Sequence, residues 1–144
     1  MRVGGAIGVF DLLHVGHLRF LQAARAQCDY LKVGLGADRL MQRSKGIRPV
    51  IEQDQRRELV AALRCVDEAC LFDIGLDNTE TALSWLLDWP VDCLFVGRDW
   101  ADSPRWQRLE PRLAEQGIDC IWLPYTPGIS SSAIRQRLRA ERDD

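Results

Sequence analysis

The feature that most constrains the fold of this chain is the regular alternation of short apolar runs with amphipathic segments. Apolar runs of strand length and mixed β-branched content occur at Val3–Phe10, Tyr30–Leu35, Glu68–Phe72, Cys93–Val96 and Cys120–Leu123. Segments with helical spacing follow at His17–Gln27, Asp54–Arg64, Thr79–Leu87, Trp106–Gln116 and Ser131–Arg139, and Gly117 suits a helix end. This alternation predicts an α/β fold with a doubly wound, five-stranded parallel sheet covered by helices on both faces.

The size and charge of the chain limit its function. Its 144 residues suit a single domain over residues 1–144, and 47% of them are hydrophobic. A formal charge of −2 leaves no polybasic surface, so we expect no nucleic-acid partner. The 19 basic residues include only two lysines, Lys32 and Lys45. Any function that requires a lysine therefore has two candidates.

The sequence also predicts where the protein acts. No apolar run reaches the length of a membrane span, and Val3–Phe10 contains glycines and leads into Asp11, so it is interpreted as a buried strand rather than a signal peptide. The five cysteines are scattered and form no CxxC pair, which favours reduced, buried thiols over disulfides or a zinc site. These features predict a cytoplasmic protein.

The segment Gly8–His17, between the first strand and the first helix, carries the strongest functional pattern. Its two histidines, three residues apart, can face one ligand, and Gly16 lets a phosphate approach the backbone. The following helix N-terminus favours an anion through its free N–H groups. A packed histidine pair and a two-ligand metal site are alternatives, but a metal needs a third ligand and His14 and His17 are the only histidines. The residues themselves favour a phosphate site.

Six segments spread over nearly the whole chain form an ordered set of motifs. They are Gly8–Asp11 with His14–His17, Tyr30–Leu35 with Asp38, Lys45-Gly46, Arg64–Glu68, Phe95–Gly97 with Asp99-Trp100, and Thr126–Ser132. In order and spacing this set resembles the cytidylyltransferase branch of the HxGH nucleotidyltransferases. That branch includes the glycerol-3-phosphate and the phosphoethanolamine or phosphocholine cytidylyltransferases.

The resemblance implies a Rossmann-like domain that transfers CMP from CTP to a small phosphorylated alcohol, such as glycerol 3-phosphate, giving a CDP-alcohol and pyrophosphate. It implies His14, His17 and Lys45 as catalytic residues that bind the triphosphate and stabilise the transition state. The nucleotide-binding residues that it implies are Val9, Phe10, Asp11, Gly16, Arg64, Thr126, Gly128, Ile129, Ser130, Ser131 and Ser132. Mg²⁺ is expected to accompany the triphosphate, with no metal site made by protein side chains. Relatives of this size also imply a homodimer.

Taken singly, several of these residues have simpler interpretations. Ser130–Ser132 can be a helix N-cap, and Lys45 can be a solvated loop residue. Arg56 and Arg64 can form the polar face of a helix. Asp99-Trp100 can be a turn with a packing tryptophan. The functional interpretation therefore depends on their joint occurrence.

The acceptor side departs from the family pattern. Tyr125 and Pro127 replace its arginine and glutamate, Asn78 lies near the position of its acceptor-binding lysine, and Arg98 replaces an aspartate. We expect Arg98 to take over part of the acceptor-phosphate binding, with Asp99 and Asn78 also at the acceptor site. Asp73, Asp77 and Asn78 are candidates to hydrogen-bond hydroxyls of the acceptor, which the sequence alone does not decide. The acceptor itself stays open between glycerol 3-phosphate, another polyol phosphate and phosphoethanolamine.

Two other functions fit part of the pattern. An adenylyltransferase would use ATP with a phosphorylated acceptor in the same chemistry. A catalytically weak, nucleotide-binding regulatory protein fits Tyr125 and the missing lysine, although His14, His17 and Lys45 argue for turnover.

Overall fold

The computed structural model describes residues 1–143, apart from the side chains of residues 99 and 143. This part of the chain forms one five-stranded sheet in which all neighbouring strands are parallel, in the order β3-β2-β1-β4-β5. The strands are β1 (Val3–Gly8), β2 (Tyr30–Gly36), β3 (Glu68–Phe72), β4 (Cys93–Gly97) and β5 (Asp119–Leu123). The predicted single α/β domain with a doubly wound, Rossmann-like sheet is confirmed.

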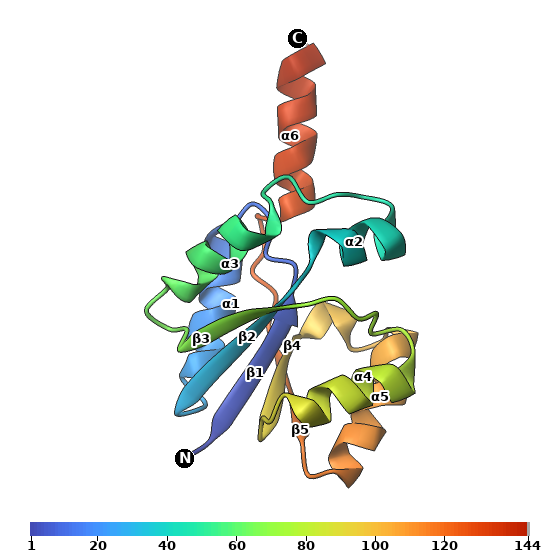
Figure 1. Cartoon of the computed structure of the whole chain (residues 1–144). Helices are drawn as coiled ribbons and strands as arrows, with labels where there is room; N and C mark the ends of the chain where they lie inside the picture. Colours follow the sequence, from blue (N-terminus) through green and yellow to red (C-terminus); the bar gives the residue numbers. More distant parts are fainter. Residues whose placement is uncertain (144) are drawn as a thin grey trace.

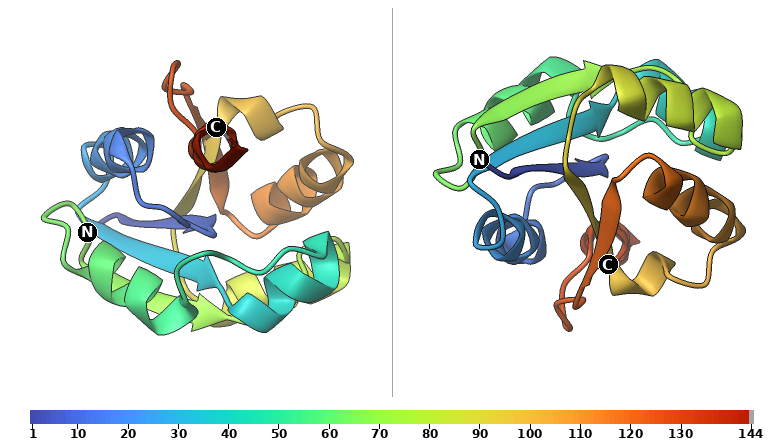
Figure 2. Two further views of the ribbon diagram at one scale, coloured as in Figure 1. Left: turned by 90° about the horizontal axis from the view of Figure 1, so that it is seen from above. Right: turned by 90° about the horizontal axis from the view of Figure 1, so that it is seen from below.

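Within residues 1–143, six α-helices and one 3₁₀ turn connect and follow the strands (Figure 1). They are α1 (Val15–Arg25), α2 (Asp38–Lys45), α3 (Gln53–Ala61), α4 (Thr79–Asp88), η1 (Arg98–Trp100), α5 (Pro104–Glu115) and α6 (Ser131–Asp143). Figure 2 shows helices on both sides of the twisted sheet. The winding reverses at β1, because β2 and β3 lie on one side of it and β4 and β5 on the other.

The apolar core forms two layers, one on each face of the sheet. One layer joins Leu21 of α1 and Val60 of α3 to Phe95 of β4. The other joins Leu109 of α5 to Leu94, the neighbour of Phe95 on the same strand. Successive strand residues point to opposite faces, so every strand except β2 contributes apolar side chains to both layers; on one face β2 presents Lys32 and two glycines. Burial on both faces explains why the strands are near-continuous apolar runs.

The two largest differences from the sequence prediction at the carboxyl ends of the strands follow β1 and β2. β1 ends at Gly8 rather than Phe10, because Phe10 adopts a φ of 55°, outside the extended region. Between the expected strand Tyr30–Leu35 and the expected helix Asp54–Arg64 the sequence predicts no helix, but Asp38–Lys45 forms α2. This helix has only eight residues, too few for a clear apolar period, and it ends at Gly46 with a φ of 66°.

The last helix, α6, extends away from the rest of the domain (Figure 1). Its first turns contact the loop after β1, whereas Leu138 near its far end is 55% exposed. None of the helices within residues 1–143 combines the length and the apolar character that crossing a membrane requires.

Candidate nucleotide-binding site

A cavity of about 510 Å³ lies at the carboxyl ends of the central strands, in the size range of small-molecule sites. Its walls come from the loop after β1, α2, the loop after β3, the η1–α5 region and the first turns of α6. The titratable side chains in these walls are Asp11, His14, His17, Lys45, Asp77, Arg105, Tyr125 and Arg135. This edge of the sheet includes the segment Gly8–His17, for which the sequence predicts a phosphate site.

The backbone at the start of α1 fixes both histidines. His14 is the N-cap of the helix, and its Nδ1 accepts a hydrogen bond from the Gly16 amide at 3.0 Å. His17 Nδ1 accepts one from the His14 amide at 3.2 Å. Because an accepting Nδ1 carries no proton, each neutral imidazole keeps its proton on Nε2. The two rings stack with their centroids 3.8 Å apart, so two N–H donors lie side by side in the cavity wall.

The environment keeps both histidines neutral. Burial lowers the pKa of His14 below its ordinary value. Burial also lowers the pKa of His17, and the neighbouring His14 adds to this effect, so that the pKa of His17 falls to about 4 despite the opposing charge of Asp11. Near neutral pH both side chains are therefore uncharged donors in the free protein.

Close packing and backbone strain shape the loop around these rings. A Cβ atom on Gly16 would lie 2.8 Å from Cε1 of His14, so a side chain there would displace that ring. Phe10 and Leu12 both adopt left-handed conformations, with φ values of 55° and 54°. Such strain at non-glycine residues persists only where the surroundings hold it, and it is concentrated at ligand-binding sites.

Asp11 is the anchor of this loop. Its carboxylate is 2% exposed and accepts hydrogen bonds from the amides of Val50 and Ile51 at 2.8 and 2.9 Å. It also forms an ion pair with Arg135 of α6. Burial would raise the pKa of Asp11, but the two amides and Arg135 together outweigh it and lower that pKa. Ser131 Oγ donates to the Asp11 carbonyl at 2.7 Å, so Asp11 connects three segments of the cavity wall.

Arg56 of α3 supports the same loop from beneath. It is 1% exposed and donates hydrogen bonds to the carbonyls of Val9 and Ile51 at 2.7 and 2.8 Å. It also pairs with Asp38 at 2.6 Å. The interpretation of Arg56 as part of a solvated polar face is therefore wrong. The planar guanidinium has five N–H donors in a fixed geometry and donates to three acceptors at once. A lysine ammonium cannot reproduce this geometry.

Lys45 and the serine run reach the cavity from two sides. Lys45 is the last residue of α2 and is exposed at the cavity wall. Ser130 caps α6, since its Oγ accepts a hydrogen bond from the Ala133 amide at 3.0 Å. Ser130, Ser131 and Ser132 all line the cavity, as do Thr126 and Ile129. Gly128, with a φ of 86°, makes the turn before them without lining the cavity itself.

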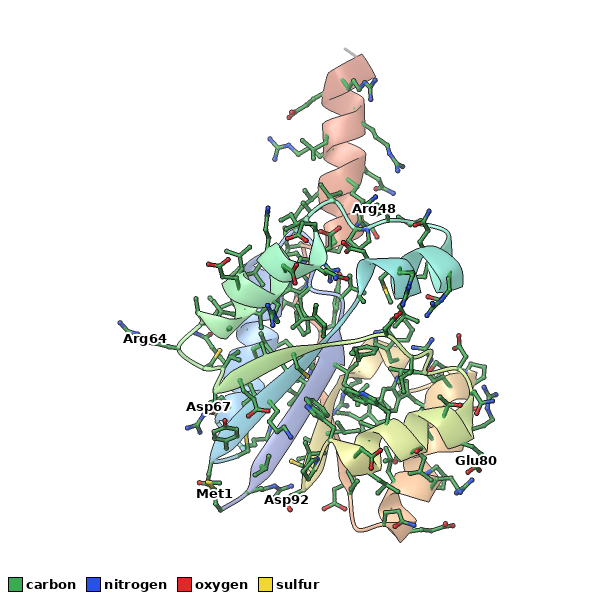
Figure 3. All side chains as sticks on the ribbon, in the orientation of Figure 1. Met1, Arg48, Arg64, Asp67, Glu80 and Asp92 are labelled. Atoms are coloured by element: carbon green, nitrogen blue, oxygen red, sulfur yellow. The ribbon has the colours of Figure 1, made fainter. Side chains whose placement is uncertain are left out.

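The structure does not bring every predicted site residue to the cavity. Arg98 is exposed at the start of η1 and Asn78 caps α4 by accepting from the Thr81 amide, and neither lines the cavity. The side chain of Asp99 lies outside the described residues. Arg64 follows α3 and is exposed far from this edge (Figure 3). In a single chain, Arg64 therefore contacts neither the cavity nor the histidines.

Two arginines of the cavity were not predicted. Arg135 follows Ser131 by four residues, one helical turn, so the spacing of α6 offered a signal for it. Arg105 follows the N-terminal proline of α5 and pairs with Asp77, and no pattern in the sequence connects those two residues.

The acidic side chains of the site do not form a metal cage. Within the described residues, no group of three or more His, Cys, Asp or Glu side chains is arranged to hold a metal ion. Asp11 is occupied by two amides and an arginine, and Asp77 is paired with Arg105. Both carboxylates are therefore already engaged by groups of the protein.

Comparison with known proteins identifies the family. A family model described as cytidylyltransferase-like matches residues 6–137. The bifunctional protein HldE of Bradyrhizobium sp. (strain ORS 278) is 49% identical over 144 residues, which cover 99% of this chain and 28% of the relative. The bifunctional protein HldE of Hyphomonas neptunium is 34% identical over 139 residues, covering 95% of this chain and 27% of the relative. The chain thus spans little more than a quarter of the length of these curated relatives.

A solved structure supports the same assignment. The lipopolysaccharide core biosynthesis protein from Thermoplasma volcanium GSS1 superposes with a TM-score of 0.69 at 26% sequence identity, covering 90% of this chain and 99% of that one. The sheet order, the histidine pair at the mouth of α1 and the extent of the family match agree with one another. This chain therefore belongs to the cytidylyltransferase-like family of nucleotidyltransferases.

Proposed function

We propose that this domain transfers a nucleoside monophosphate from a nucleoside triphosphate to the phosphate of a hydroxylated acceptor, with release of pyrophosphate. The observation that carries the proposal is the pair of Nε2–H donors of His14 and His17 in the wall of the cavity. Lys45 and the capped N-terminus of α6 supply further positive potential along the same wall.

In this reaction an oxygen of the acceptor phosphate attacks the α-phosphorus, and the bond from that phosphorus to the bridging oxygen breaks. The electron pair leaves with pyrophosphate, so no covalent enzyme intermediate is needed. The histidine donors would stabilise charge that develops around the α-phosphorus. Lys45 and the hydroxyls of Ser130 and Ser132 would hold the β- and γ-phosphates, and the loop anchored by Asp11 would keep the nucleotide in line for attack.

The nucleotide is proposed to be CTP, with Mg²⁺ as part of the substrate complex, on the resemblance of the motifs. ATP is the second candidate, because the curated relatives that cover nearly the whole chain are named bifunctional HldE proteins rather than cytidylyltransferases. Among acceptors, the structural relative in lipopolysaccharide core biosynthesis favours a sugar phosphate over glycerol 3-phosphate, since lipopolysaccharide cores are built from sugars.

Pyrophosphate release tests this proposal. The purified chain is incubated with CTP or ATP, Mg²⁺ and a panel containing hexose 1-phosphates, glycerol 3-phosphate and phosphoethanolamine. We expect turnover with one nucleotide and at least one acceptor, and a loss of about 100-fold or more in kcat/KM for His17→Ala. Arg57→Ala, which changes an exposed residue of α3 that does not line the cavity, serves as the comparison variant. Binding of the nucleotide without turnover on any acceptor would instead support a regulatory protein.

We also propose a homodimer. The exposed Leu138 on the projecting part of α6 offers an apolar contact for a second copy. Arg64 would act on a nucleotide only if dimerisation brought it to the site of the other subunit. Light scattering after size-exclusion chromatography measures the molar mass in solution, and the mass of a monomer at micromolar concentration would contradict the proposed homodimer.

A further inference from the structure

An ion pair that the family pattern does not predict forms part of the cavity wall. Arg105, in the first turn of α5, donates from Nε and Nη2 to a single oxygen, Oδ1 of Asp77, at 3.0 and 2.6 Å. Both residues line the cavity. Among the described side chains, which do not include that of Asp99, Oδ2 of Asp77 and Nη1 of Arg105 take part in no hydrogen bond. The pair therefore offers a free acceptor and free donors next to each other.

Alcohol groups suit this arrangement better than ions do. A hydroxyl both donates and accepts, so neighbouring hydroxyls can bind the carboxylate and the guanidinium at the same time. The pair carries no net charge, so it attracts phosphate less than Lys45 and the start of α6 do. Those two groups are among the proposed phosphate contacts. An ammonium group that approached Asp77 would also meet the guanidinium of Arg105, which repels it.

Tryptophans in the same cavity wall provide the apolar part of such a site, and Trp100 is the exposed one, since Trp106 is 7% exposed and belongs to the core. Trp100 at the end of η1 and Trp106 of α5 both line the cavity, and Trp100 is 44% exposed. Flat aromatic surfaces of this kind bury the C–H faces of a carbon chain or ring, while polar groups at their edge bind its oxygens. Apolar rings next to a donor–acceptor pair match a molecule that is hydroxylated and uncharged apart from its phosphate.

We infer that Asp77 and Arg105 bind the hydroxyl-bearing part of the acceptor, so that the acceptor is a phosphorylated sugar or polyol rather than a phosphorylated amino alcohol. This inference rests on the proposed transfer reaction and assigns its specificity to two residues. It also replaces the expectation for Arg98, which does not line the cavity.

Steady-state kinetics of Asp77→Asn and Arg105→Gln test the assignment. The acceptors are a hexose 1-phosphate, glycerol 3-phosphate and phosphoethanolamine, each with the nucleotide that the wild-type chain prefers. Both variants should raise KM for the hydroxylated acceptors at least about tenfold, as expected for losing hydrogen bonds to charged groups, and change KM for the nucleotide less than about twofold. Arg105→Gln leaves the negative charge of Asp77 without its partner, so the ratio of kcat/KM for phosphoethanolamine to kcat/KM for the sugar phosphate should rise. Asp77→Asn removes that charge, so the same ratio should fall.

Glu80→Gln is the matched control. Glu80 of α4 pairs with Arg112 of α5, so this variant also removes an ion pair that holds α5 near α4, but neither residue lines the cavity. Figure 3 shows Glu80 on the outer side of these helices. Its KM values should equal those of the wild type, and thermal melting should show all three variants folded.

The outcomes separate the inference from the reaction on which it rests. Unchanged acceptor KM in both variants, or a wild-type preference for phosphoethanolamine, overturns the assignment and leaves the transfer reaction standing. A wild-type chain that releases no pyrophosphate with CTP or ATP and any acceptor overturns the proposed function and this inference with it.

Discussion

At the scale of single residues, the site depends on two histidines that stay uncharged. Their Nδ1 atoms accept hydrogen bonds from the amides of Gly16 and His14, so the donor face is fixed by the backbone before any ligand arrives. Burying a neutral imidazole in the cavity wall costs less desolvation free energy than burying a charged one. The hydrogen bond that it donates becomes stronger when the acceptor gains negative charge.

His17 should therefore resist protonation. Its pKa of about 4 lies below the ordinary value of 6.5, so the unfolded chain binds the proton first. The free energy of unfolding should then fall as the pH drops from about 6.5 toward 4, and His17→Gln should flatten that slope. Nitrogen-15 NMR of the free protein at pH 6 should show His17 neutral with its proton on Nε2. A protonated His17 ring at pH 6 would contradict this.

Arg56 should be the most costly arginine to replace. It is 1% exposed, and its removal leaves the carbonyl of Val9, the carbonyl of Ile51 and the carboxylate of Asp38 without their donor. Arg56→Gln should lower the free energy of unfolding by about 3 kcal/mol or more, measured by urea denaturation. The adjacent Arg57→Gln, which removes only a solvent-exposed contact with Asp54, should change it by less than about 0.5 kcal/mol. Equal effects would show that burial of Arg56 is unimportant.

These residues also show what the sequence could predict of the site. The histidine pair, Lys45 and the serine run are local motifs, and the histidines and serines reach the cavity from the starts of helices that periodicity predicts. Arg56 and Arg105 owe their roles to partners 47 and 28 positions away along the chain. An arginine in an amphipathic helix suggests an exposed side chain, and only the packed fold reveals that Arg56 is buried.

At the scale of elements, the strands were predictable because each is a buried apolar run, whereas α2 was not. α2 is short, and its two buried residues, Leu40 and Met41, are consecutive, so no helical period appears. The helix matters for the site because it carries Lys45 at its final position.

The end of α2 should be sensitive to one glycine. Gly46 caps the helix with a φ of 66° and has open space around it, so a substituted side chain meets no clash but does incur backbone strain. Gly46→Ala should lower the free energy of unfolding by about 1 kcal/mol and raise KM for the nucleotide by displacing Lys45. Gly117→Ala changes another left-handed glycine, at the end of α5, and should cost similar stability without altering that KM. If the nucleotide KM rises in both variants, the cause is a general loss of stability rather than displacement of Lys45.

At the scale of the whole molecule, the residues that line the cavity are spread along the sequence from Ile7 to Arg135. A ligand bound there contacts segments from nearly the full length of the chain. The two core layers share a single sheet, which favours one cooperative unfolding transition. A ligand that binds only the folded state stabilises it by mass action.

The triphosphate should therefore raise the melting temperature of the entire domain, and the nucleoside should not. The proposed contacts, from His14, His17, Lys45 and the start of α6, all fall on phosphates. At a concentration one hundred times its Kd, the preferred triphosphate with Mg²⁺ should add about 2.7 kcal/mol to the free energy of unfolding, which shifts the melting temperature by about 9 °C for a domain of this size.

Calorimetric scans with CTP, ATP, cytidine and adenosine measure this shift and rank the two nucleotides. Lys45→Met, which removes an exposed charge, should keep the melting temperature of the free protein but reduce the shift. Equal shifts from triphosphate and nucleoside would place recognition on the base instead of the phosphates.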